Sequence, residues 1–239
     1  MLNRVLSSLP DEMYSFQESF LFNLYVLRNR LSFVFSRQPN LAIWLKRSHA
    51  DYVSICRSLD DPVLSRFSER SPVRILDVGS GSGALAQALL EHLKGRRLDW
   101  SYHGVDRLLP AVEHARSVFG YHPNIAFSYG DIVDYPIPER RYDLVVCFGA
   151  LLCLPDRDEY LRVFRRLLAA LADGGCLFVG GIITPECTYK YGRVAVAAEE
   201  LVSCIDGARY AFQILDENEF LGLDSYDAKA KAMLVRRKA

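Results

Sequence analysis

The sequence has no excess of charge of either sign. Its 29 Lys and Arg residues equal its 29 Asp and Glu residues, so the formal net charge at pH 7 is zero. Proteins dedicated to nucleic acid usually carry a basic domain or stripe. The balance therefore argues against a nucleic-acid partner, although it leaves room for a local basic patch.

The six cysteines include no CxxC pair, and the N-terminus has no apolar core of a signal peptide. The most apolar stretch, residues 20–35, is interrupted by Arg28 and Arg30. A membrane span needs about 20 largely uncharged residues. We therefore expect free thiols, no transmembrane segment and a cytoplasmic location.

Glycine is absent before Gly79, and residues 12–70 show helical spacing of apolar side chains. We interpret residues 1–70 as an N-terminal helical cap that contributes to substrate binding. Residues 71–239 then form a second domain, because strands and helices alternate there. Such alternation is typical of a doubly wound α/β fold, a parallel sheet with helices on both faces.

The expected elements of the second domain follow from apolar runs bounded by Gly, Pro and polar turns. Two short runs at its end, Leu223–Tyr226 and Ala232–Arg236, predict an antiparallel pair at the sheet edge. The predicted strands span 73–78, 101–106, 125–129, 142–148 and 176–179, and the predicted helices span 84–93, 110–119, 156–171 and 194–204.

Polar and glycine residues gather where the predicted strands end, which is where open α/β sheets bind ligands. Strand one ends in a glycine loop, whose backbone can approach a ligand closely and whose following helix presents free N–H groups. The loop contains Asp77, Gly79, Ser80, Gly81 and Gly83.

The next two strands end in carboxylates. Asp106 is placed to accept hydrogen bonds from ribose hydroxyls. Asp131 offers a carboxylate to an exocyclic amine, and Ile132 offers an apolar side chain to a purine face. Each carboxylate alone could be a helix or turn cap, but their register at successive strand ends predicts an adenosine site. Arg107 and Phe148 complete the predicted cofactor-binding residues.

The stretch Arg74–Gly83 resembles the first motif of the class I S-adenosylmethionine methyltransferases. The resemblance continues through Gly104–Asp106, Tyr129–Asp131, Tyr142–Val146 and Leu167–Phe178. It implies a Rossmann-like, seven-stranded sheet whose strand seven is antiparallel. It also implies S-adenosylmethionine as cofactor and S-adenosylhomocysteine as product.

The resemblance assigns roles to matching residues. Asp77 and the glycine loop would hold the methionine moiety, Asp106 the ribose, and Asp131 and Ile132 the adenine. A rival interpretation remains, because the loop also fits the G-x-G-x-x-A spacing of NAD(P)-binding domains. The position of Asp77, two residues before the first glycine, favours the methyltransferase.

The catalytic residue is not determined by the sequence. Methyl transfer can rely on proximity and orientation, and a base is needed only when the acceptor must lose a proton early. Three weak candidates are His49, Cys153 and Tyr14. The simpler alternatives are a packing thiol for Cys153 and a buried tyrosine for Tyr14. An acidic metal triad is missing, so we expect no metal.

The aromatic side chains of the N-terminal segment predict a small apolar or aromatic acceptor. The same helices could instead pack onto the sheet or pair with a second copy in a homodimer. RNA or protein methylation, and cofactor binding without catalysis, are the alternatives. The shortage of candidate bases favours nitrogen, activated carbon or an acidic hydroxyl as the acceptor atom.

Overall fold

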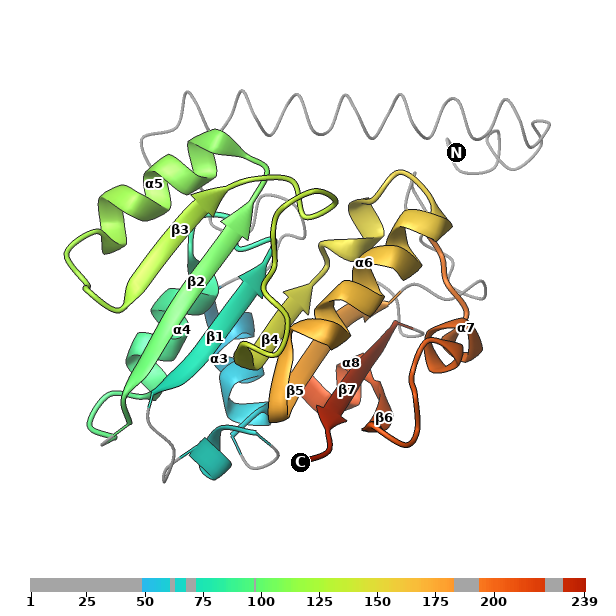
Figure 1. Ribbon diagram of the computed structural model, residues 1–239. Coiled ribbons are helices and arrows are strands. Elements are labelled where there is room, and N and C mark those ends of the chain that lie inside the picture. The colour runs from blue at the N-terminus through green and yellow to red at the C-terminus, as the bar shows by residue number, and fades with distance from the viewer. Residues whose placement is uncertain (1–48, 61–62, 68–71, 97, 183–193, 222–229) are drawn as a thin grey trace, which may run out of the picture.

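The computed structural model describes residues 49–60, 63–67, 72–96, 98–182, 194–221 and 230–239. Its strands form one seven-stranded sheet in the order β3-β2-β1-β4-β5-β7-β6, with helices against both faces (Figure 1). The strands are β1 (Val73–Val78), β2 (Trp100–Asp106), β3 (Ile125–Tyr129), β4 (Tyr142–Phe148), β5 (Leu171–Ile182), β6 (Tyr210–Asp216) and β7 (Lys231–Arg237). The described helices are α3 (His49–Ser58), α4 (Ala84–His92), α5 (Leu109–Phe119), α6 (Arg157–Ala170), α7 (Ala198–Ser203) and α8 (Glu217–Leu221), with short 3-10 turns η1 (Leu64–Phe67) and η2 (Leu151–Cys153).

Strands β1 to β5 pair in parallel, whereas β7 runs antiparallel to both of its neighbours, β5 and β6. This arrangement confirms the predicted fold, a doubly wound Rossmann-like sheet with an antiparallel seventh strand. It brings the carboxyl ends of the first four strands to one edge of the sheet.

The partner of the last strand differs from the prediction. Tyr210–Asp216 pairs with β7 along its whole length, whereas the predicted partner, Leu223–Tyr226, lies outside the described residues. The sequence gives no alternation for β6, because Ala211 to Ile214 are exposed on both faces of this edge strand. A period of two arises only where one face is buried.

The fifth strand is also longer than predicted. It begins at Leu171, which pairs with Tyr142, and the Asp173–Gly175 turn forms an irregularity within it. Helix α6 consequently ends at Ala170, and the predicted helix 194–204 is the shorter α7.

The two faces of the sheet bury separate cores. Ile75 packs with α3, α4 and α5, whereas its neighbour Leu76 packs with α6 and α7 on the other face. This follows from the alternation of side chains along a strand. The apolar side chains on both faces of these strands are thus buried, as a parallel sheet requires.

Helix α3 and the 3-10 turn η1 lie in the described part of the predicted cap. Ile55 and Cys56 of α3, and Leu59 directly after it, are buried in the same core as α4. Tyr14 and the side chain of His49 lie outside the described residues, and the boundary at residue 70 stays a prediction. Within the described part of the chain, no helix has the length and apolarity to cross a membrane.

Candidate functional site

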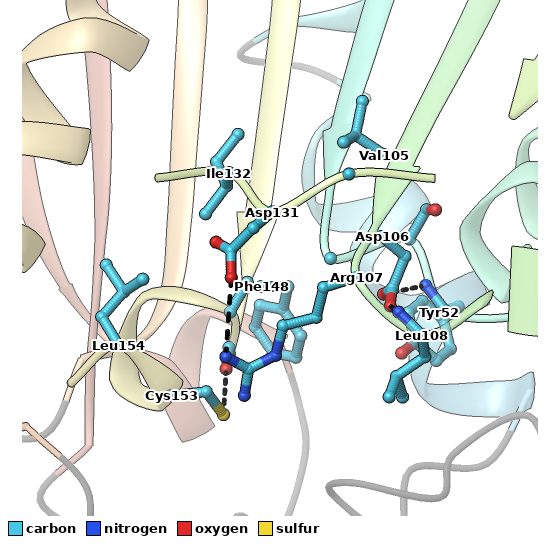
Figure 2. A pocket seen from close by; sticks show the side chains of 16 residues that line it. Tyr52, Val105, Asp106, Arg107, Leu108, Asp131, Ile132, Phe148, Cys153 and Leu154 are labelled. Carbon is cyan, nitrogen blue, oxygen red and sulfur yellow. Dashed lines mark hydrogen bonds and ion pairs between the residues drawn. The ribbon is translucent and has the colours of Figure 1, made fainter. Parts of the chain in front are cut away.

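The ends of four strands meet at one pocket. Val78 of β1 lies opposite Val105 of β2 and Cys147 of β4, and Asp106 lies opposite Tyr129 of β3. The pocket is an open hollow with about 860 Å³ of empty space, the open mouth included. It is lined by Tyr52, Gly79, Ser80, Gly81, Val105, Asp106, Arg107, Leu108, Gly130, Asp131, Ile132, Phe148, Gly149, Ala150, Cys153 and Leu154 (Figure 2).

The glycine loop between β1 and α4 needs two of its glycines for different reasons. Gly83 has a φ of +92°, and a Cβ there would lie 2.6 Å from the ring of Phe119 and 2.9 Å from that of Phe127. Gly81 has a φ of +53°, and a Cβ there would meet no described atom within 4 Å. Gly83 therefore lets the helix pack closely, whereas Gly81 leaves its backbone open to the pocket that it lines.

Asp106 ties this loop to the turn that follows β2. Its Oδ2 accepts a hydrogen bond from the Gly81 N–H at 2.8 Å, and its Oδ1 accepts one from the Leu108 N–H at 2.8 Å. Burial raises the pKa of this carboxyl, and the two backbone donors oppose the rise. Each carboxylate oxygen can accept a further bond, so the fixed carboxylate can still bind a ligand hydroxyl.

Ser80 presents a hydroxyl without a partner. The residue is 7% exposed, and its Oγ has no hydrogen-bond partner among the described residues. Buried polar atoms in folded proteins are nearly always hydrogen-bonded. Because Ser80 lines the pocket, a bound polar ligand would supply the missing partner.

The turn after β3 forms the wall next to Asp106. Asp131 accepts a hydrogen bond from the Val133 N–H at 3.0 Å, and its carboxylate lies 4.0 Å from the Arg107 guanidinium. In Figure 2 the Arg107 side chain extends across the view between Asp106 and Cys153. Ile132 is buried beside Asp131. A carboxylate, a cation and an apolar side chain thus share this side of the pocket.

Asp77 lies beneath the glycine loop and is not among the residues that line the pocket. Its Oδ2 accepts a 2.5 Å hydrogen bond from the Tyr102 hydroxyl, and both residues are buried. Burial raises the pKa of Asp77 to about 7, the Tyr102 hydroxyl lowers it in part, and the nearby Asp106 raises it further. The carboxyl therefore changes charge near neutral pH.

The opposite wall follows β4 and is mainly apolar. Phe148 stacks on Phe178 with their ring centroids 6.0 Å apart. Beyond it, Ala150 and Leu154 line the pocket, and the half-buried Cys153 thiol donates to the Gly149 carbonyl at 3.6 Å. This hydrogen bond is compatible with the packing role and leaves the catalytic role of Cys153 a prediction.

Helix α3 contributes Tyr52, a pocket residue that the sequence argument missed. Tyr52 lies on one helical face with the buried Ile55, Cys56 and Leu59, at spacings of three, four and seven residues. This spacing was a usable signal for an inward-facing side chain. It could not show that the helix reaches the cofactor side of the sheet, because that depends on where α3 packs.

Most predicted cofactor-binding residues are brought together in this pocket. Asp77 and Gly83 lie outside its lining. Of the weak catalytic candidates, Cys153 is at the wall, whereas Tyr14 and the His49 side chain fall outside the described residues. In the described ranges no histidine lines the pocket, and no cluster of three or more metal-ligating side chains occurs there. The residues at the wall are Gly79, Ser80, Gly81, Asp106, Arg107, Asp131, Ile132 and Phe148.

Comparison with known families decides how this geometry is classified. The profile of the family described as "Methyltransferase domain" matches residues 75–175, which include the glycine loop, Asp106, Asp131 and the wall after β4. Residues 75–175 therefore match a methyltransferase domain. The prediction from the first motif is therefore confirmed at the level of the family.

Curated relatives of this methyltransferase domain match about half of the chain. A malonyl-[acyl-carrier protein] O-methyltransferase of Chlorobium luteolum is 35% identical over 135 residues, covering 54% of this chain and 48% of that protein. Ajmaline N-methyltransferase of Rauvolfia serpentina is 26% identical over 114 residues, covering 46% of this chain and 35% of that protein. The chain thus spans about half, or less, of the length of these relatives.

Solved structures agree on the fold of the methyltransferase domain. The N-methyltransferase NodS of Bradyrhizobium japonicum, solved with S-adenosylhomocysteine, gives a TM-score of 0.61 at 17% identity, covering 88% of this chain and 97% of that one. The CcbJ methyltransferase of Streptomyces caelestis gives 0.57 at 17% identity, covering 80% and 90%. At this identity the likeness concerns the fold.

Proposed function

We propose that this chain transfers a methyl group from S-adenosylmethionine to a small-molecule acceptor. The observation that carries the proposal is the pocket at the ends of β1, β2 and β3. Three groups face one cavity there. They are the Ser80 hydroxyl, which has no hydrogen-bond partner among the described residues, the Asp106 carboxylate, which is held by a backbone N–H, and the Asp131–Ile132 pair. These groups match the polar and apolar parts of an adenosine-bearing ligand.

The side chains and backbone groups at the pocket are chemically suited to this cofactor. The open backbone at Gly81 and the Ser80 hydroxyl would hold the methionine side, and Asp106 would accept from the ribose hydroxyls. Asp131 would accept from the adenine amine while Ile132 packs on the ring. When bound, the cofactor supplies an electrophilic methyl group. The contribution of the chain is to orient that group toward the acceptor.

The topology argues against the NAD(P) alternative. Dinucleotide-binding sheets are mostly parallel and follow the order 3-2-1-4-5-6. Here an antiparallel β7 lies between β5 and β6. The family match to a methyltransferase domain points the same way.

The acceptor side is the wall after β4. Phe148, Ala150 and Leu154 make it apolar, which supports an acceptor with an apolar or aromatic part. Because no histidine of the described residues lines this wall, we infer that the acceptor needs little help in losing its proton. The relatives are named for both O- and N-methylation, so an acceptor screen should contain acids and amines.

Calorimetric titration tests the cofactor assignment. We expect micromolar binding of S-adenosylmethionine and S-adenosylhomocysteine, and no binding of NAD(P)H. Asp106→Ala should weaken binding at least about tenfold, because the variant loses charge-assisted hydrogen bonds worth about 1.4 kcal/mol or more. Asp158→Asn, on the exposed first turn of α6, is the matched control and should bind as the wild type does.

Two results would contradict the proposal. Binding of NADPH in place of S-adenosylmethionine would identify a dinucleotide-binding protein. Equal affinity of the wild type and the Asp106→Ala variant would remove Asp106 from the site. Cofactor binding without turnover on any acceptor would instead favour a non-catalytic binding protein.

A further inference from the structure

One arginine of helix α6 supports the loop that carries Asp131 and Ile132. The Arg166 Nη1 donates to the Ile132 carbonyl at 2.9 Å and to the Val133 carbonyl at 2.5 Å, and its Nη2 donates to the Tyr135 carbonyl. One guanidinium therefore serves three carbonyls of a single turn. Of these four residues, Ile132 lines the pocket, whereas Val133, Tyr135 and Arg166 do not.

The other bonds within the turn converge on Asp131. The Val133 N–H donates to the Asp131 Oδ1 at 3.0 Å, and the N–H groups of Asp134 and Tyr135 donate to the Asp131 carbonyl at 3.1 Å and 2.7 Å. The Asp131 side chain is 46% exposed. Contacts from outside the turn therefore help to keep its carboxylate aimed at the pocket.

The guanidinium is suited to this task because of its shape. Its N–H donors lie in one plane in a rigid fork, so one side chain can reach several carbonyls at once. Tyr135 is held from its other end, since its hydroxyl lies 3.3 Å from His103 Nε2. Arg166 of α6 and His103 of β2 thus contact the turn from two different elements.

We propose that Arg166 is a positioning residue for recognition of the adenine base. By fixing three carbonyls of the turn, it holds the Asp131 carboxylate where the exocyclic amine would lie and Ile132 where the ring would pack. This inference rests on the proposed function, because it assumes an adenosine-bearing cofactor. It extends that function to a residue that does not touch the ligand.

The proposal predicts a change in base discrimination. The two ligands are S-adenosylhomocysteine and S-inosylhomocysteine. The second carries a carbonyl oxygen in place of the exocyclic amine and therefore has no donor at the position assigned to Asp131. In the wild type we expect a clear preference for the adenosine compound. In Arg166→Met that preference should shrink about tenfold, equivalent to about 1.4 kcal/mol, because the loosened carboxylate no longer selects the amine.

Two further variants separate positioning from a general effect on folding. Arg165→Met removes an exposed arginine one residue earlier on the same helix and should keep the wild-type affinities. Arg166→Lys keeps the charge and lacks the fork, so it should fold and show an intermediate loss of discrimination. In ligand-free Arg166→Lys, the amides of Val133 and Tyr135 should exchange hydrogen faster than in the wild type. The amides of β3 should exchange at the wild-type rate.

The outcomes are distinct from failure of the proposed function. If the wild type does not bind S-adenosylhomocysteine, the cofactor assignment itself is wrong. If the wild type binds and Arg166→Met weakens both ligands equally, Arg166 has a structural role alone and the inference is overturned. Unchanged discrimination and unchanged amide exchange in Arg166→Lys would overturn it as well, even if Arg166→Met does not fold.

Discussion

A single buried carboxyl links the stability of this domain to pH. Asp77 is 5% exposed, and in the described core its carboxylate accepts a hydrogen bond from the Tyr102 hydroxyl. Burial raises its pKa from 3.8 to about 7 in the folded chain. Burial also raises the pKa of Asp106, so two neighbouring acids favour protonation in the folded state.

The sign of the pH effect follows from the direction of the shift. A group whose folded pKa exceeds its unfolded pKa adds stability below the unfolded value and loses it as pH rises through the folded value. Asp77→Asn cannot titrate and can still accept from Tyr102. Between pH 5 and pH 8 the variant should therefore gain stability relative to the wild type, by about 1–3 kcal/mol.

Urea unfolding of both proteins at the two pH values measures this difference. Asp158→Asn, with its exposed carboxylate, serves as the control and should show a difference that does not vary with pH. A pH-independent difference for Asp77→Asn would mean that Asp77 stays ionised in the folded protein.

At the scale of elements, the glycine loop fixes how α4 meets the sheet. Gly83 combines a left-handed backbone with close approach to Phe119 and Phe127. Gly95 has a similar φ of +83°, but no described atom lies within 4 Å of the position that a Cβ would take. Substitutions at the two glycines therefore separate the loss of stability caused by backbone strain from the loss caused by crowding.

We expect alanine at these positions to have unequal effects on stability. Gly95→Ala should cost about 1–2 kcal/mol, because a left-handed backbone disfavours any Cβ. Gly83→Ala should cost about 1–3 kcal/mol more, since overpacking a core has that magnitude. Chemical denaturation of the two variants provides the comparison. Equal losses would show that the aromatic rings move aside without penalty.

The elements also show what a sequence can reveal. The buried parallel strands were predictable because apolar runs such as Tyr142–Phe148 are bounded by polar turns. Strand β6 was not, since an edge strand exposed on both faces has no alternation. Arg166 was equally hidden, because an arginine on an amphipathic helix looks like a solvated residue, and its partners are backbone carbonyls of an irregular turn.

At the scale of the molecule, the described walls of the pocket come from residues between Tyr52 and Leu154. The groups that match an adenosine-bearing ligand lie at the ends of β1, β2 and β3. We therefore expect the cofactor site to be separable from residues 1–48, which we assign to the acceptor side. This assignment is a prediction from the aromatic composition of that segment.

A chain that starts at residue 49 tests the separation. Its affinity for S-adenosylhomocysteine should stay within about threefold of the full chain, or about 0.7 kcal/mol, while turnover of an identified acceptor falls. Calorimetry and a methyl-transfer assay on both proteins give the two values. Loss of cofactor binding in a folded shortened chain would show that the N-terminal segment completes the cofactor site.

The place of β7 between β5 and β6 has a consequence for the nascent chain. Because β5 and β6 precede β7 in the sequence, each is synthesised before its partner on the side that β7 fills. Unpaired strand edges are templates for pairing with other chains, and domains tend to fold as they emerge. We therefore expect both edges to stay unpaired until the seven residues Lys231–Arg237 join the sheet, and this step removes both as sites of pairing with other chains.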